Sequence, residues 1–185
     1  SVFTGFSIGG KEDAMSFQTV IWIEYATQDV FFELTPLQEP EAIVGNFYWP
    51  GPMEFTSRRR DWYSLISLMQ GLLIPNDWEY AVDRVTFDGQ MCSAGAYMPW
   101  FGQVRPGASY IAIVCDPWDA GYQAKHPAGS DYCHLSVRWL PSLGKLAYRR
   151  TVKYRFVKDG DYNELCKVYR AYAKEKGLVV TLREK

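Results

Sequence analysis

The sequence has almost no net charge and no long apolar run. Its 20 Lys and Arg balance 21 Asp and Glu, which gives a net charge of −1 over 185 residues. This balance gives no electrostatic reason to expect nucleic acid or an anionic membrane as a partner. The longest apolar run, YIAIVC at 110–115, is far shorter than the roughly 20 residues that cross a bilayer. The first residues, SVFTGFSIGGKEDAM, lack the basic start and apolar core of a signal peptide.

The motifs of common enzyme classes are also missing. The chain has two histidines, His126 and His134, and no nucleophile elbow, phosphate-binding loop or dinucleotide fingerprint. Cys133 precedes His134 in an expected strand, where neighbours point to opposite faces, so the two do not form a dyad. We see no clustered metal ligands and expect no metal and no cofactor. The carboxylates in loop-like settings are Asp88, Asp116, Asp119 and Asp131, and a turn role is favoured for each.

Cysteines are few, and their spacing excludes a zinc site. The four are Cys92, Cys115, Cys133 and Cys166, and no pair is closely spaced. Buried free thiols are the default interpretation, which leans toward a reducing, cytoplasmic compartment. A Cys115–Cys133 disulfide is the alternative in a secreted protein.

The sequence is rich in strand-forming patterns and in aromatic residues, with 7 Trp, 13 Tyr and 10 Phe. Segments rich in β-branched and aromatic residues predict strands; they lie at 16–26, 29–34, 41–49, 109–116, 132–140 and 146–157. Gln28-Asp29 marks a turn, and Asp88-Gly89 predicts a hairpin. Many strands at short intervals indicate a mainly β protein, an antiparallel β-sandwich.

Two segments allow alternatives. In 146–157 the side chains alternate, so that a basic row, Arg149, Thr151, Lys153 and Arg155, is expected on a solvated outer face. In 58–73 the apolar spacing is helical, but Gly71 interrupts it, and LLIP before Asn76 is typical of a strand.

One C-terminal α-helix is expected. Asp161 and Glu164 have capping-box spacing, and Gly177 suits the left-handed residue that ends a helix. Between them, apolar residues recur at helical spacing; they are Leu165, Val168, Tyr169 and Tyr172. The short apolar run LVVTL after Gly177 is typical of a connection that leads into another secondary-structure element.

Two aromatic stretches, expected as loops, are the candidate binding site. They are AYMPWFGQVRPGASY at 96–110 and CDPWDAGYQAKHPAGSDYC at 115–133. Aromatic faces beside amide and carboxylate groups suit sugars, whose C–H faces stack on rings while their hydroxyls hydrogen-bond. The candidate substrate-binding residues are Trp100, Phe101, Gln103, Trp118 and Asp119. The alternative is that both loops pack on a neighbouring domain.

Four motifs together resemble one family. MPWFGQ, DPWDA, VRWLPSLGKLAYRRTVKYRF and GDYNELCKVYRAYAKEKGLVVTLREK resemble the segment before the catalytic barrel in bacterial glycoside hydrolases of family 129. These enzymes are relatives of the family 101 endo-α-N-acetylgalactosaminidases. The resemblance covers residues 90–185 well, whereas 1–80 share only general β character.

The resemblance implies a galactose-mutarotase-like supersandwich over 1–158, with the helix and stub of 159–185 leading toward a (β/α)8 barrel. That barrel would carry the catalytic Asp/Glu pair of a retaining mechanism. The chain alone would then be non-catalytic, with carbohydrate and the intramolecular barrel as partners and neither nucleic acid nor membrane. The resemblance also implies strand–turn–strand around Gly71. The alternatives are a free-standing carbohydrate-binding module or an interaction domain without sugar affinity.

Overall fold

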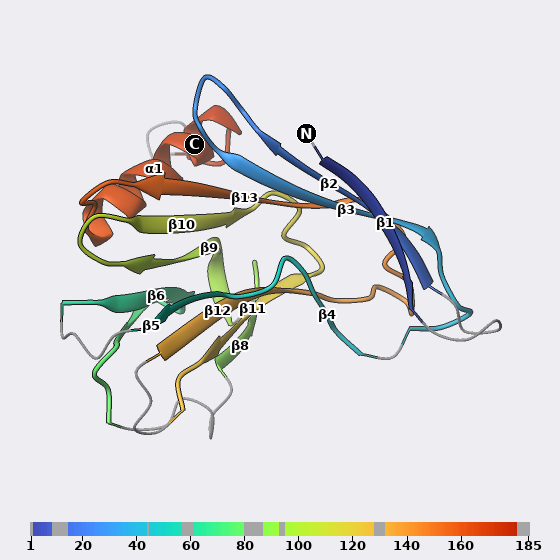
Figure 1. The fold of residues 1–185 in the computed structure, drawn as a ribbon, viewed down its shortest axis with the longest axis horizontal. Coiled ribbons are helices and arrows are strands. Elements are labelled where there is room, and N and C mark those ends of the chain that lie inside the picture. Colours follow the sequence, from blue (N-terminus) through green and yellow to red (C-terminus); the bar gives the residue numbers. More distant parts are fainter. Residues whose placement is uncertain are drawn as a thin grey trace.

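Two β-sheets face each other, and one helix lies outside them (Figure 1). The computed structural model describes residues 2–8, 15–43, 45–56, 61–79, 87–92, 95–127 and 132–180. All named strand pairs are antiparallel. The predicted mainly β fold, an antiparallel sandwich with one C-terminal helix, is confirmed. In the part of the chain described, no helix has the length and apolar character to span a membrane.

The larger sheet has eight strands in the order β1-β2-β3-β13-β10-β9-β6-β7. Their bounds are β1 Val2–Ile8, β2 Met15–Ile23, β3 Val30–Gln38, β13 Arg150–Val157, β10 Ser109–Val114, β9 Ala96–Val104, β6 Tyr63–Leu68 and β7 Leu72–Pro75. The smaller sheet has the order β4-β12-β11-β8, with β5 also paired to β12. Its strands are β4 Phe47–Tyr48, β5 Met53–Thr56, β8 Phe87–Gln90, β11 Ala120–Lys125 and β12 Tyr132–Trp139.

The main core lies between the two sheets. Strand β13 shows how alternation builds it, because Val152 and Tyr154 point into the core while Thr151 and Lys153 point to the outer face. The largest fully buried apolar side chains of this core come from both sheets; they are Trp139, Tyr110, Tyr122, Tyr154, Phe17, Phe101, Leu34, Ile66 and Met91. Burial of this apolar surface supplies the main driving force for closing the sandwich.

The ambiguous segment is a hairpin. Within the described part of 58–73, β6 leads through a turn to β7, as the resemblance implied and against the helical spacing. Met69 and Gly71 both have positive φ, 48° and 109°, and Gly71 N donates to Leu68 O at 2.8 Å. Gly71 is thus the turn residue that interrupted the pattern, because a glycine adopts this backbone conformation without steric cost.

The hairpin predicted at Asp88-Gly89 is wrong. Both residues lie inside β8 and pair with Gln123 and Tyr122 of β11. An Asp-Gly pair permits a tight turn but does not force one, and here the ladder with β11 keeps the backbone extended. The turn predicted at Gln28-Asp29 is confirmed, since Gln28 has a φ of 58° and Glu24 N donates to Asp29 O at 2.9 Å.

Helix α1, Tyr162–Glu175, begins and ends where the sequence predicts. The Asp161 carboxylate accepts hydrogen bonds from Asn163 N at 2.9 Å and Glu164 N at 3.1 Å. The Glu164 side chain does not complete a capping box but pairs with Lys167. At the other end Gly177 has a φ of 68°, and Leu178 N donates to Ala173 O at 2.8 Å, as in a Schellman motif.

The helix packs on the outer face of the larger sheet and forms a second, smaller core there. Leu165 and Tyr172 of α1 contact outward-facing residues of β9 and β10. Trp100 stacks on Tyr169 with ring centroids 6.1 Å apart. Gly102 of β9 allows this close approach, since a Cβ there would lie 3.1 Å from Leu165 Cδ1 and 2.5 Å from the Tyr110 carbonyl oxygen. Because the helix packs mainly on β9 and β10, it leaves part of the sheet on the far side of β10 uncovered (Figure 1).

Candidate functional site in a groove beside the helix

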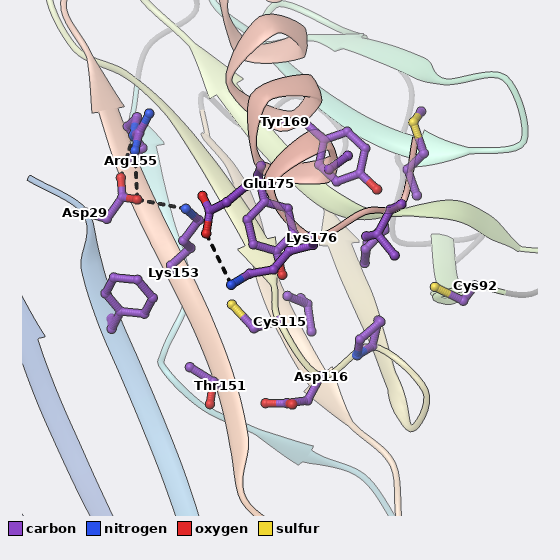
Figure 2. Close-up of a pocket in the computed structure, with 18 of the residues that line it drawn as sticks. Asp29, Cys92, Cys115, Asp116, Thr151, Lys153, Arg155, Tyr169, Glu175 and Lys176 are labelled. Carbon is purple, nitrogen blue, oxygen red and sulfur yellow. Dashed lines mark hydrogen bonds and ion pairs between the residues drawn. The ribbon is translucent and has the colours of Figure 1, made fainter. Parts of the chain in front are cut away.

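A groove of about 1070 Å³ opens on the described surface. It lies between the C-terminal end of α1 and the outer face of β2, β3, β13 and β10 (Figure 2). Residues 178–180, which follow the helix, form part of its wall, and Trp118 of the loop after β10 lies at its edge. The helix that packs on β9 and β10 thus creates the site by stopping short of β3.

A fully buried carboxylate with two cations forms the floor. Asp29, at the end of the β2–β3 turn, accepts from Lys153 Nζ at 2.8 Å and from Arg155 Nη2 at 2.9 Å, both at Oδ2. Arg155 Nε donates to the other oxygen, Oδ1 (Figure 2). Burial alone would raise the pKa of Asp29, but the hydrogen bonds from Arg155 and Lys153 outweigh it and hold the pKa below its usual value.

This arrangement corrects part of the solvated basic row predicted for Arg149, Thr151, Lys153 and Arg155. Lys153 is 7% exposed and Thr151 is 9% exposed, because the end of α1 lies over them. Lys153 Nζ lies 4.9 Å from the ring centroid of Tyr172 and 5.8 Å from that of Phe31. The alternation was predicted correctly, but α1 covers Thr151 and Lys153, and Lys153 and Arg155 pair with Asp29. The expected exposure to solvent holds for Arg149, whose side chain is 66% exposed.

Aromatic rings and a thiol complete the walls. Trp22 and Phe31 stack with centroids 4.8 Å apart and planes 3° from parallel. The Cys115 thiol lies near Lys153 and Asp116 (Figure 2). Burial raises the pKa of Cys115, so its thiol is protonated at neutral pH and is a poor nucleophile.

The four cysteines are all free, which excludes the Cys115–Cys133 disulfide in this structure. Cys133 is buried in β12 of the smaller sheet, whereas Cys115 follows β10 of the larger one. Cys92 and Cys166 are exposed, so the prediction of buried thiols is wrong for these two.

The buried carboxylate of the groove does not have the properties of a catalytic acid. Glycoside hydrolysis needs one carboxyl group that holds a proton and a second that acts on the sugar. Asp29 stays ionised, and three hydrogen bonds from two cations occupy it, so it cannot serve as the proton donor. Among the described residues, no group of three or more His, Cys, Asp or Glu could hold a metal ion.

Three of the five predicted site residues are buried in strand β9. Residues 96–104 form this strand, so the predicted loop is wrong. Phe101 belongs to the main core, and Trp100 lies under α1. Gln103 Nε2 donates to Ser64 Oγ at 3.0 Å and to Cys133 O at 2.6 Å. The stretch resembled a loop because β9 is buried on both faces and therefore shows no polar alternation.

The other two predicted residues lie in the loop before β11 and differ in role. Trp118 is 75% exposed and lines the groove. Asp119 instead accepts from Tyr148 OH at 2.8 Å and lies 3.7 Å from the Arg150 guanidinium. The Arg150 side chain is fully buried and also donates to the Leu146 carbonyl, so Asp119 helps to anchor the segment before β13. Of the other loop carboxylates, Asp116 lines the groove, and Asp131 lies outside the described residues.

The sequence patterns did not predict that Asp29, Lys153 and Arg155 form one cluster. The alternation in β13 places Lys153 and Arg155 on one face, which was a usable signal. Their partner lies 124 and 126 residues away along the chain, and no local pattern connects them.

Comparison with solved structures identifies proteins similar to this chain over its whole length. In its complex with GalNAc, the α-N-acetylgalactosaminidase NagBb from Bifidobacterium bifidum is 38% identical, with a TM-score of 0.85. The same enzyme with Gal-NHAc-DNJ gives 39% and 0.87, and its ligand-free form 38% and 0.84. Each match covers 100% of this chain but 32% of NagBb. No protein-family model matches, and a search of curated proteins finds no match. By sequence and by fold, the chain therefore corresponds to a domain-sized third of a glycoside hydrolase.

Proposed function

We propose that this chain is the non-catalytic β-sandwich domain of a glycoside hydrolase that acts on α-linked N-acetylgalactosamine. The observation that carries this proposal is the full-length match to one third of NagBb, at 38–39% identity and with TM-scores of 0.84–0.87. Identity at this level over the whole of this chain supports common descent as well as a common fold. The fold alone would not suggest the sugar, because one fold hosts many functions.

The finer assignment also belongs to this proposal. Residues 1–158 would be a galactose-mutarotase-like sandwich of the kind found in families 129 and 101, and residues 159–185 would lead toward a (β/α)8 barrel. The capped helix α1, held against the sandwich by Leu165 and Tyr172, is a rigid base for such a connection. Catalytic carboxylates would then lie outside this chain, which agrees with an Asp29 that is locked by two cations.

A second candidate is a carbohydrate-binding module, and the exposed indole of Trp118 favours it. Its flat face at the groove edge could stack on a sugar ring, with the hydroxyl of Thr151 and the carboxylate of Asp116 nearby for hydrogen bonds. Trp100, Phe101 and Gln103 would support this site only indirectly, since all three are buried.

Hydrolysis of an aryl α-N-acetylgalactosaminide separates these candidates. The polypeptide encoded by the complete reading frame is expected to release the aryl group, and residues 1–185 alone are expected to be inactive and to bind N-acetylgalactosamine too weakly to saturate. Hydrolysis by residues 1–185 would contradict a non-catalytic domain. Tight sugar binding by residues 1–185 that Trp118→Ala abolishes would favour the binding module.

A further inference from the structure

The groove beside α1 is bordered by apolar side chains that this domain leaves uncovered. Trp118, Tyr97, Leu178 and Val180 line it and expose 75%, 61%, 60% and 58% of their surface. Singly exposed apolar residues are ordinary on a protein surface. Several around one concave feature mark a surface that another molecule covers.

The chemistry of this border favours a protein surface over a sugar. Leu178 and Val180 are aliphatic and offer neither a flat ring nor a hydrogen-bonding group. In the floor of the groove Asp29 pairs with both Lys153 and Arg155, so each of the three charged groups has a partner, and the cluster carries one net positive charge. A partner that covers the groove therefore meets exposed apolar side chains at the border and a floor whose charged groups already pair with one another, which lowers the cost of burying them.

The backbone after α1 runs along the groove and forms part of its wall. Gly177 ends the helix in a left-handed conformation, and the hydrogen bond from Leu178 N to Ala173 O fixes the direction in which the chain leaves. Residues 178–180 then line the groove. Whatever follows them is therefore tethered beside this surface, and tethering raises the effective concentration of a partner to the millimolar range.

We infer that the groove is the docking surface for the catalytic part of the same polypeptide, with an apolar ridge of that part seated between Trp118 and residues 178–180. This inference rests on the proposed function. The match covers 32% of NagBb, so about two thirds of an enzyme of that kind lies outside this domain. The exposed border and the direction of the chain after Gly177 identify where it packs.

The native thiol of Cys92 gives a direct test, because it is exposed and lines the groove. Its rate of modification by a maleimide, resolved by peptide mass spectrometry, is compared between residues 1–185 and the longer polypeptide. A Leu143→Cys variant supplies the control, since Leu143 is fully exposed and lies outside the groove. We expect Cys92 to react at least about tenfold more slowly in the longer polypeptide, while the control thiol reacts equally in both.

A second variant reports on the contact itself. Leu178→Asp places a charge in the interface and is expected to restore fast labelling of Cys92 in the longer polypeptide, while leaving the circular dichroism of residues 1–185 unchanged. Equal labelling of Cys92 in both forms, in a longer polypeptide that hydrolyses the sugar, would overturn the docking surface and leave the proposed function standing. A reading frame that stops at Lys185 would overturn both.

Other occupants of the groove would give different results. Protection of Cys92 in residues 1–185 that grows with protein concentration would assign the groove to a second copy of the chain. Protection of Cys92 in residues 1–185 by N-acetylgalactosamine would assign it to a sugar. Either result would overturn the inference.

Discussion

The ammonium group of Lys153, on the last strand, lies 2.8 Å from the buried carboxylate of Asp29, at the turn that leads into β3. This contact joins two segments 124 residues apart, and Arg155 donates to both oxygens of the same carboxylate. The three groups tie the β2–β3 turn to β13 at the floor of the groove. Each of the three charged groups has a partner, and the cluster as a whole carries one net positive charge.

Replacement of the carboxylate tests this cluster. Asp29→Asn leaves Lys153 buried beside Arg155 without an anion, and we expect the free energy of unfolding to fall by about 3 kcal/mol. Urea unfolding followed by circular dichroism measures the change. Glu33→Gln is the matched control, because Glu33 is paired at 3.6 Å with an Arg149 whose side chain is 66% exposed, and we expect a change of about 0.5 kcal/mol or less. Equal losses of unfolding free energy in the two variants would show that the Asp29 cluster stabilises the fold no more than the exposed Glu33–Arg149 pair does.

The same carboxylate predicts how stability depends on acid. The pKa of Asp29 lies below its ordinary value of 3.8 in the folded chain, because the hydrogen bonds from Arg155 and Lys153 outweigh the effect of burial. A lowered pKa means that the unfolded state takes up the proton first, so the stabilisation by Asp29 is present above 3.8 and is lost as the pH falls through the folded value. We expect the stability gap between wild type and Asp29→Asn to be constant near neutrality and to narrow below pH 3.8. A gap that does not change with pH would contradict this account.

Close packing of the helix on β9 predicts a cost for one added methyl group. A Cβ at Gly102 would lie 2.5 Å from the Tyr110 carbonyl oxygen and 3.1 Å from Leu165 Cδ1. Gly102→Ala must therefore move β10 or the helix, and we expect a loss of about 1–3 kcal/mol in the free energy of unfolding. Gly51→Ala is the control, since no atom lies within 4 Å of its added Cβ. Thermal unfolding of both variants measures the two changes. An unchanged stability of Gly102→Ala would contradict the close packing of the helix on β9.

Substitution of Asp119 tests whether this residue anchors the loop or contacts sugar. Its carboxylate accepts from Tyr148 OH and lies beside the buried guanidinium of Arg150. We expect Asp119→Ala to lower the free energy of unfolding by about 2 kcal/mol, because charged hydrogen-bond partners are lost. Asp116→Ala, in the same loop, is expected to change it by about 0.5 kcal/mol or less. Unchanged stability of Asp119→Ala, together with weaker sugar binding, would restore the predicted role in substrate contact.

The parts of the fold that local chemistry specifies were predictable from the sequence. The cap at Asp161, the apolar stripe from Leu165 to Tyr172 and the stop at Gly177 act within a few residues, and α1 follows them. The alternation in β13 was equally local. Burial on both faces is not local, because β9 lies between the sandwich core and a helix that begins about 60 residues later. For this reason the stretch around Trp100 and Gln103 resembled an aromatic loop.

The candidate site was predictable only in part. Trp118 was identified from the aromatic composition of its segment, and its exposure agrees with a role at a surface. The contact of Asp29 with Lys153 requires three strands to pair in one order, β2-β3-β13, and the groove requires α1 to stop before β3. Such long-range placements depend on the whole sheet and leave no motif in the sequence.

The most direct test of the central claim is to determine the coding frame beyond Lys185. This account predicts several hundred further codons whose translated sequence alternates strand and helix patterns and carries Asp and Glu after strand ends, as a (β/α)8 barrel would. A stop codon directly after Lys185 would contradict the claim that this sandwich is one domain of a longer hydrolase.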